Sequence, residues 1–310
     1  MFSGVLNGAL ASIAQLKPVL IAVMGATGSG KTTFINKISG SDLLTSHGLA
    51  SCTNEVTLSK DFTLARRTVI LIDTPGFDDS TISDTDVLKM IGLYLSTTYE
   101  KGYKLAGIIY MHRITDPKVG GVSRKNFRMF RKLCGDDTLK NIVIVTNMWG
   151  QVDPERGAER ELELQTDEDL FKPVLREGAT MLRHYNTVAS AEAILLQLVH
   201  NSPQALRIQQ ELVDERKDLA DTGAGQEVAR ELMELKKKHR QEVAELTKEI
   251  EEAAKEKDVR AQKEISEERK LYEERIAKAQ HDLDNMSKQN EEEKKKLEAK
   301  IESIKEERMC

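Results

Sequence analysis

Short apolar runs alternate with helical patterns over the first two hundred residues of the chain. The apolar runs lie at 19–24, 68–72, 106–110 and 141–145, with a weaker one at 181–186. The helical patterns lie at 32–39, 85–99, 123–134, 160–177 and 190–200. A continuous apolar run suits a strand that is buried on both faces. The alternation therefore predicts an α/β fold, with a mainly parallel sheet and helices on both of its faces.

The pattern changes near residue 225, where turn residues end and charged residues take over. The last proline is Pro203, the last glycine is Gly225, and 45 of the 85 residues from Gln226 onward are Asp, Glu, Lys or Arg. Apolar residues spaced by three and four begin at Val228 in this charged field. The spacing is typical of a coiled coil, but slips near Lys257 leave a single exposed helix as the alternative.

These patterns divide the chain into four segments. We expect an N-terminal arm at 1–17, a P-loop domain at 18–200, a helical linker with a glycine break at 201–225, and a coiled-coil or extended helical tail at 226–310.

Composition excludes several classes of protein. No apolar run approaches the ~20 residues of a membrane span, and the net charge of −5 gives no general basic footprint for nucleic acid. The three cysteines are odd in number and lack metal-ligand spacing. We therefore expect a cytoplasmic protein with reduced thiols and no transmembrane segment, and peripheral membrane association stays open.

A phosphate-binding loop follows the first predicted strand. Residues 25–32 read G-A-T-G-S-G-K-T, a full match to G-x-x-x-x-G-K-[ST] between a strand and a helix. Backbone N–H groups of such a loop surround phosphates, the lysine reaches the β- and γ-phosphates, and the hydroxyl binds Mg²⁺. The residues expected to bind the nucleotide here are Gly25, Ala26, Thr27, Gly28, Ser29, Gly30, Lys31, Thr32 and Thr33.

A second motif, Asp73-Thr74-Pro75-Gly76, closes the strand at 68–72. Asp73 at a strand end can hold Mg²⁺ through water, and the Gly76 N–H can bond the γ-phosphate. Thr53 lies between the two motifs, where a switch threonine would complete the Mg²⁺ shell. The alternative for Thr53 is a local turn bond in a polar loop.

These motifs carry a family resemblance. G-A-T-G-S-G-K-T, then S-C-T at 51–53, then D-T-P-G-F-D-D at 73–79 resemble the septin-related G domains, among them the plastid-import Toc GTPases and the immunity-associated GTPases. The blocks 107–116 and 129–135 resemble a fungal branch of that group, described as G-domain proteins. The resemblance covers about residues 18–200. It implies a guanine-nucleotide switch that binds GTP or GDP with Mg²⁺ and pairs through its nucleotide faces.

The base-reading motif departs from that family. The pattern [TN]-K-x-D after the fifth strand supplies an Asp for the guanine edge, whereas this chain reads Thr146-Asn147-Met148-Trp149. Loss of that carboxylate removes a main reason to prefer GTP, because specificity comes from buried polar groups that need partners. Asn147 and Trp149 remain base-site candidates, with Trp149 either stacking on the base or capping the core. Asp153 and Asn186 are possible substitutes for the missing partner.

A second departure affects hydrolysis. Phe77 stands where Ras-type enzymes have a water-orienting Gln, and a phenyl ring cannot orient water. The resemblance places Arg113 at an arginine that acts across a dimer interface in the immunity-associated group. The alternative is that Arg113 caps a turn with Asp116. The expected catalytic residues are thus Arg113, Thr53 and Gly76, and the expected Mg²⁺ ligands are Thr32, Thr53 and Asp73.

The leading hypothesis is a GTPase switch with slow or dimerisation-stimulated hydrolysis, pairing through its nucleotide face, its tail or both. The first alternative is a nucleotide-binding scaffold with negligible turnover. The second is an ATP-using enzyme with the same phosphate chemistry. The tail would serve a protein partner that the sequence does not identify.

Overall fold

The computed structural model describes residues 17–45, 55–79, 81–116, 121–255, 259–286 and 294–299. The expected N-terminal arm, apart from Lys17, and the candidate Thr53 lie outside these residues.

A parallel sheet forms the centre of the α/β domain. Its parallel strands are β1 (Val19–Gly25), β4 (Arg67–Asp73), β5 (Gly107–Arg113), β6 (Ile142–Asn147) and β7 (Thr180–Arg183). Two short strands, β2 (Thr57–Leu58) and β3 (Phe62–Leu64), pair antiparallel with β4. In the described part of the chain the order is β2-β4-β1-β5-β6-β7, with β3 also beside β4. The predicted strands and their parallel arrangement are confirmed.

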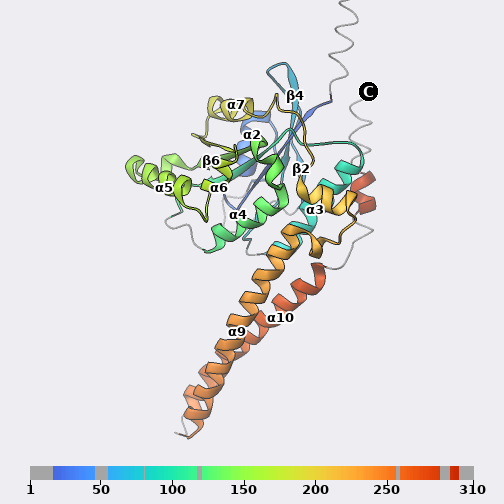
Figure 1. Ribbon diagram of the computed structural model, residues 1–310. Coiled ribbons are helices and arrows are strands. Elements are labelled where there is room, and N and C mark those ends of the chain that lie inside the picture. Colours follow the sequence, from blue (N-terminus) through green and yellow to red (C-terminus); the bar gives the residue numbers. More distant parts are fainter. Residues whose placement is uncertain are drawn as a thin grey trace, which may run out of the picture.

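Helices cover both faces of the sheet (Figure 1). Within β1, Ile21 and Val23 face one apolar cluster, and Ala22 and Met24 face the other, as the period of two in a strand requires. The first cluster includes side chains of α2 (Lys31–Ser39) and α7 (Val188–Leu196). The second includes α3 (Asp84–Glu100) and α4 (Gly121–Cys134). The central strands β1, β5 and β6, and β4 from Val69 onward, are buried on both faces, which explains their continuous apolar sequences.

The predicted helix at 160–177 is wrong as a single element. The chain forms α5 (Pro154–Thr166) and then the short α6 (Lys172–Arg176). Asp167 has extended backbone angles at the end of α5, and Pro173 lies in the first turn of α6. A proline has no N–H for a helical hydrogen bond and fits only at a helix start. Two 3₁₀ turns, η1 (Asp136–Asn141) and η2 (Trp149–Gln151), flank β6.

The linker contains α8 (Arg207–Gln209), a π-helical turn η3 (Gln210–Asp214) and a 3₁₀ turn η4 (Leu219–Asp221). The long helix α9 (Gly223–Lys255) begins inside the stretch in which the sequence predicted a glycine break. The break thus precedes Gly223, and Gly225 lies within the helix. An added Cβ on Gly225 would approach the Leu219 carbonyl oxygen to 1.9 Å, so this glycine permits close backbone packing.

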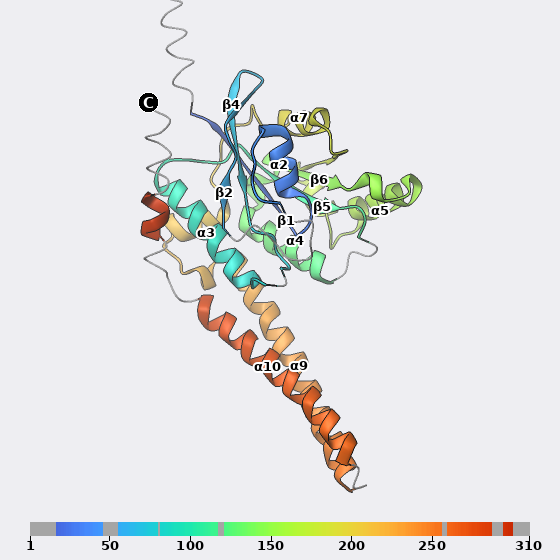
Figure 2. The same ribbon diagram turned by 180° about the vertical axis from the view of Figure 1, so that it is seen from behind.

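The tail is a helical hairpin and not a single extended helix. Helix α10 (Val259–Met286) runs back along α9, as Figures 1 and 2 show. His239 packs against Tyr272 with tilted rings whose centroids are 5.3 Å apart, and Lys236 donates a hydrogen bond to Gln280. The apolar seam is therefore shared by two antiparallel segments of one chain. The slips in spacing near residue 257 coincide with the reversal between α9 and α10.

The hairpin packs on the α/β domain. At the start of α9, Ala224 and Val228 are buried in the same apolar cluster as α3 and α4, and Met286 at the end of α10 joins that cluster. Burying a valine or methionine side chain contributes about 1.5–3 kcal/mol. Residues 294–299 are helical again and return to the end of α3, where Lys294 pairs with Glu100 at 3.1 Å. None of the described helices is long and apolar enough to cross a membrane.

Candidate functional site

The phosphate loop connects β1 to α2 at the carboxyl edge of the sheet. Gly30 precedes α2 with φ of 92°, and an added Cβ there would lie 2.5 Å from the Asn147 amide nitrogen. The position therefore needs glycine both for its backbone angle and for its close neighbour. Helix α2 begins at Lys31, so its first N–H groups point toward the loop. Thr33 in the first turn is exposed.

Lys31 is buried, with its side chain lying along the loop. Its Nζ donates to the carbonyl oxygens of Gly25 at 3.1 Å and Ala26 at 3.0 Å. Burial lowers the pKa of Lys31 to about 8, against the opposing effects of the Asp73 and Asp79 carboxylates. Burial disfavours the charged form of the lysine, and a nearby negative charge stabilises it. The Lys31 ammonium is therefore suited to bind phosphate oxygens.

Asp73 and Thr32 form the candidate metal centre. The Thr32 hydroxyl donates to Asp73 Oδ2 at 2.7 Å. Asp73 Oδ1 is buried and has no hydrogen-bond partner among the described residues. Burial is the main cause that raises the pKa of Asp73. A buried carboxylate oxygen beside a hydroxyl is a hard oxygen donor set, so these two residues fit Mg²⁺. The third expected ligand, Thr53, lies outside the described residues.

The segment after Asp73 lies directly on the phosphate loop. The Thr27 N–H donates to the Phe77 carbonyl oxygen at 2.8 Å, and the Thr27 hydroxyl donates to Asp79 Oδ2 at 3.1 Å. An added Cβ on Gly76 would lie 2.5 Å from the Thr27 nitrogen, so a larger residue would separate the two segments. The Phe77 ring is fully buried in the core. It therefore points away from the phosphate side, where a water-orienting group would have to act.

Arg113, at the end of β5, lies beside the phosphate loop of its own chain. Its Nη1 is 3.5 Å from the Thr27 carbonyl oxygen, and its Nε forms an ion pair with Asp116 Oδ1 at 3.0 Å. The guanidinium is one-third exposed. Arg113 thus makes the turn contact with Asp116 and also lies beside the phosphate loop.

The base-site candidates have separate surroundings. The Asn147 amide nitrogen donates to the Ser29 carbonyl oxygen at 3.0 Å, which ties β6 to the phosphate loop. Trp149 donates from Nε1 to the Thr146 carbonyl oxygen at 3.1 Å, and Arg183 covers its ring at 4.1 Å. Trp149 is thus engaged in packing at the end of β6, as in the core-cap alternative. Asn147 supports the loop, a contact that the sequence motif did not indicate.

The possible substitutes for the missing carboxylate are Asp153, just before α5, and Asn186, just after β7. Asp153 accepts hydrogen bonds from the N–H groups of Glu155 and Arg156 and thereby caps α5. Asn186 follows β7 with φ of 56° and is exposed. Asp153 is therefore committed to a helix cap, whereas Asn186 lies in an open loop.

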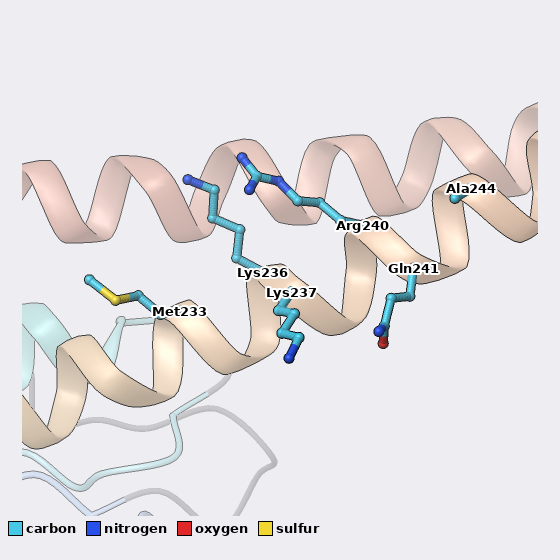
Figure 3. A pocket seen from close by; sticks show the side chains of 6 residues that line it. All are labelled: Met233, Lys236, Lys237, Arg240, Gln241 and Ala244. Carbon is cyan, nitrogen blue, oxygen red and sulfur yellow. The ribbon is translucent and has the colours of Figure 1, made fainter.

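A cavity of about 480 Å³ lies on the helical hairpin and not at the phosphate loop (Figure 3). In Figure 3 Lys236 and Arg240 extend from α9 toward α10, while Lys237 and Gln241 point away from it. The lining residues are Met233, Lys236, Lys237, Arg240, Gln241 and Ala244. They come from successive turns of one helix, so the cavity is a surface hollow between side chains. We assign no function to it.

Residues 20–148 match the family model described as 50S ribosome-binding GTPase. The chain has the P-loop fold of a G domain, followed by a long helical region. Toc33 from Arabidopsis thaliana in complex with GDP and Mg²⁺ is similar in structure, with 14% identity, a TM-score of 0.47, and coverage of 65% of this chain and 91% of that chain. Toc33 in complex with Mg²⁺ and GMPPNP has 16% identity, a TM-score of 0.44, and coverage of 58% and 75%. No curated protein matches the sequence.

Proposed function

We propose that this protein is a guanine-nucleotide-binding switch that hydrolyses GTP slowly with Mg²⁺. The observation that carries the proposal is the arrangement of Lys31, Thr32 and Asp73 at the carboxyl edge of β1 and β4. It unites a buried ammonium, a hydroxyl and a partnerless carboxylate oxygen (among the described residues) at the start of one helix. Triphosphate hydrolysis relies on positioning and charge stabilisation, and these groups supply both.

Different residues of the chain would bind the phosphates, hold Mg²⁺ and keep the loop in shape. The loop N–H groups and Lys31 bind the phosphates, and Thr32 and Asp73 would hold Mg²⁺, which neutralises phosphate charge when bound. Asn147 keeps the loop in shape through Ser29. Gly76 lies close enough to Thr27 for its N–H to respond to a terminal phosphate. Thr53 remains a proposed switch residue from its sequence position alone.

Guanine is favoured by motif resemblance and not by the base site. The G-A-T-G-S-G-K-T and D-T-P-G-F-D-D motifs resemble those of septin-related G domains, including the Toc and immunity-associated groups. Trp149 packs under Arg183 and offers no carboxylate to a base. ATP therefore remains a second candidate substrate. A third candidate, a scaffold with negligible turnover, is favoured by the burial of the Phe77 ring.

Single-turnover hydrolysis of GTP and of ATP, each with and without Mg²⁺, separates these functions. We expect GTP to be cleaved faster than ATP and only with Mg²⁺. Equal cleavage of the two nucleotides would make the protein a general nucleoside triphosphatase. Tight binding of GTP with no cleavage over many hours would make it a scaffold.

Substitution of Arg113 tests whether a second copy of the chain takes part in hydrolysis. We propose that its guanidinium stabilises charge on the phosphates, for which such groups contribute about 10³–10⁵ in rate where they act. The contact with Thr27 allows action within one chain, whereas pairing of two nucleotide faces would bring it to the partner. Arg113→Ala should slow hydrolysis with little change in affinity. A rate per molecule that rises with protein concentration in wild type, and not in the variant, supports action on the partner. An unchanged rate in Arg113→Ala would leave only the turn contact with Asp116.

A further inference from the structure

We propose that Asp79 is a catalytic residue that orients the attacking water. The inference rests on the proposed hydrolysis of a nucleoside triphosphate and names the group that replaces the missing glutamine. It starts from Phe77, whose ring is buried in the core and whose carbonyl oxygen accepts the Thr27 N–H at 2.8 Å. Since Phe77 is fixed by both its side chain and its backbone, another group must meet the water.

Asp79 is the carboxylate that the segment after Gly76 presents to the phosphate loop. Its Oδ2 accepts the Thr27 hydroxyl at 3.1 Å. Its negative charge also raises the pKa of Lys31, as does that of Asp73. The contact with Thr27 places this carboxylate at the phosphate loop, where the terminal phosphate of a bound nucleotide would lie.

The carboxylate is held in one orientation. Its other oxygen, Oδ1, accepts the Thr81 N–H at 2.7 Å, the Thr81 hydroxyl at 2.6 Å and the Ile82 N–H at 3.3 Å. These bonds fix Oδ1 on the side of α3 and leave Oδ2 directed at the loop. A catalytic group is effective when its geometry is set before the reaction in this way.

The neighbouring cation completes the arrangement. Arg113 Nη1 lies 3.5 Å from the Thr27 carbonyl oxygen, so Thr27 is contacted by an anion at its hydroxyl and approached by a cation at its carbonyl.

In the reaction, the water oxygen bonds to the terminal phosphorus and the bond from phosphorus to the bridging oxygen breaks. The nucleoside diphosphate keeps that electron pair, and both protons of the water end on the inorganic phosphate. Asp79 accepts a hydrogen bond from the water and aligns it for this displacement.

The chain offers a matched control in Asp78. Asp78 is the adjacent residue with the same charge, but its backbone N–H donates to Asp84 Oδ1 at 2.9 Å and its side chain is exposed. Asp78→Asn therefore removes one negative charge from the same segment without touching Thr27. Asp79→Asn keeps an oxygen for the Thr81 and Ile82 bonds while removing the carboxylate.

The experiment measures single-turnover GTP hydrolysis and GMPPNP affinity in four full-length proteins: wild type, Asp78→Asn, Asp79→Asn and Asp79→Ala. We expect both Asp79 variants to lose about 10²-fold or more in rate, as removal of a positioned acceptor does, with affinity within about threefold of wild type. Asp78→Asn should stay within about twofold in rate. A loss in Asp79→Ala alone would assign Asp79 to the turn and overturn the proposal. Wild-type rates in both Asp79 variants would overturn it as well. Absence of turnover in the wild type would overturn the hydrolytic function itself.

Discussion

The contact between the hairpin and the α/β domain depends on Lys125, so Lys125→Met should loosen it. The Lys125 Nζ lies 2.8 Å from Asp84 Oδ2 on α3 and 3.1 Å from Glu231 Oε2 on α9. One cation from α4 thus joins two carboxylates from two other helices. Methionine keeps most of the aliphatic length, so the substitution removes the charge and leaves much of the packing.

The size of the effect follows from burial. The side chains of Lys125, Asp84 and Glu231 are 29%, 16% and 10% exposed. An exposed pair contributes ~0.2–1 kcal/mol, whereas breaking a buried pair costs ~3–5 kcal/mol. This half-buried bridge lies between those limits, so we expect a loss of about 1–3 kcal/mol in the stability of hairpin docking. The variant also leaves two carboxylates facing each other without the cation between them.

The loss should depend on pH. Burial raises the pKa of Glu231, and Lys125 opposes that rise. Without Lys125 the folded-state pKa of Glu231 increases further above the unfolded value. A carboxyl whose pKa is raised on folding destabilises the fold at pH above that pKa, and protonation relieves the effect as the pH falls. The destabilisation by Lys125→Met should therefore be greater at pH 8 than at pH 5.

Urea unfolding and hydrogen exchange of the first turns of α9 measure this loss. Arg131→Met is the control, because Arg131 lies on the same helix and pairs with Asp136 where both side chains are exposed, 39% and 76%. We expect the control to change stability by less than about 0.5 kcal/mol. The double variant Lys125→Met with Glu231→Gln should recover part of the loss. A Lys125→Met protein as stable as wild type at pH 8, with unchanged exchange in α9, would refute the reasoning.

Three further predictions concern binding and the tail. Lys31→Ala should abolish detectable GMPPNP binding in calorimetry and leave the far-ultraviolet circular dichroism unchanged; unchanged affinity would remove the phosphate-site assignment. Asn147→Ala should weaken nucleotide binding by about tenfold, since the loop loses its bond at Ser29; an affinity equal to wild type would show that the loop holds its shape alone. Residues 1–225 expressed alone should still bind nucleotide but unfold at lower urea than the full chain, because Val228 no longer covers α3 and α4; equal midpoints would make the hairpin an independent stalk.

The core and the phosphate loop were readable from the sequence because their signals are local. A strand buried on both faces must be apolar at every position, so β1 and β4 appear as runs without help from the rest of the chain. The loop needs glycines at fixed spacing before Lys31, which makes its pattern specific. Roles that depend on distant partners were not readable. Nothing in the local sequence indicates that Asn147 would reach Ser29 or that Asp79 would contact Thr27.

The hairpin was missed for a related reason. Helix α9 ends at Lys255 and α10 begins at Val259, and the residues between contain neither glycine nor proline. Glycine and proline mark a turn only where the backbone angles of that turn require them. Conversely, Gly225 was taken as a break although it lies in α9, where close packing against Leu219 requires it. Glycine marks both turns and close contacts, and sequence alone does not separate the two.

Charge complementarity between α4 and α9 is the signal that could have located the tail. Helix α4 carries Arg124, Lys125, Arg128, Arg131 and Lys132, and the first turns of α9 carry Glu227, Glu231 and Glu234. Arg128 pairs with Glu227 at 2.7 Å and with Glu231 at 3.1 Å. Lys125 and Arg128 of α4 therefore find acidic partners on α9 within the same molecule. The same face of α4 reaches Asp84, whose other carboxylate oxygen accepts the Asp78 N–H. A chain of polar contacts, from Asp78 through Asp84 and Lys125 to Glu231, thus connects the segment after Gly76 to the hairpin.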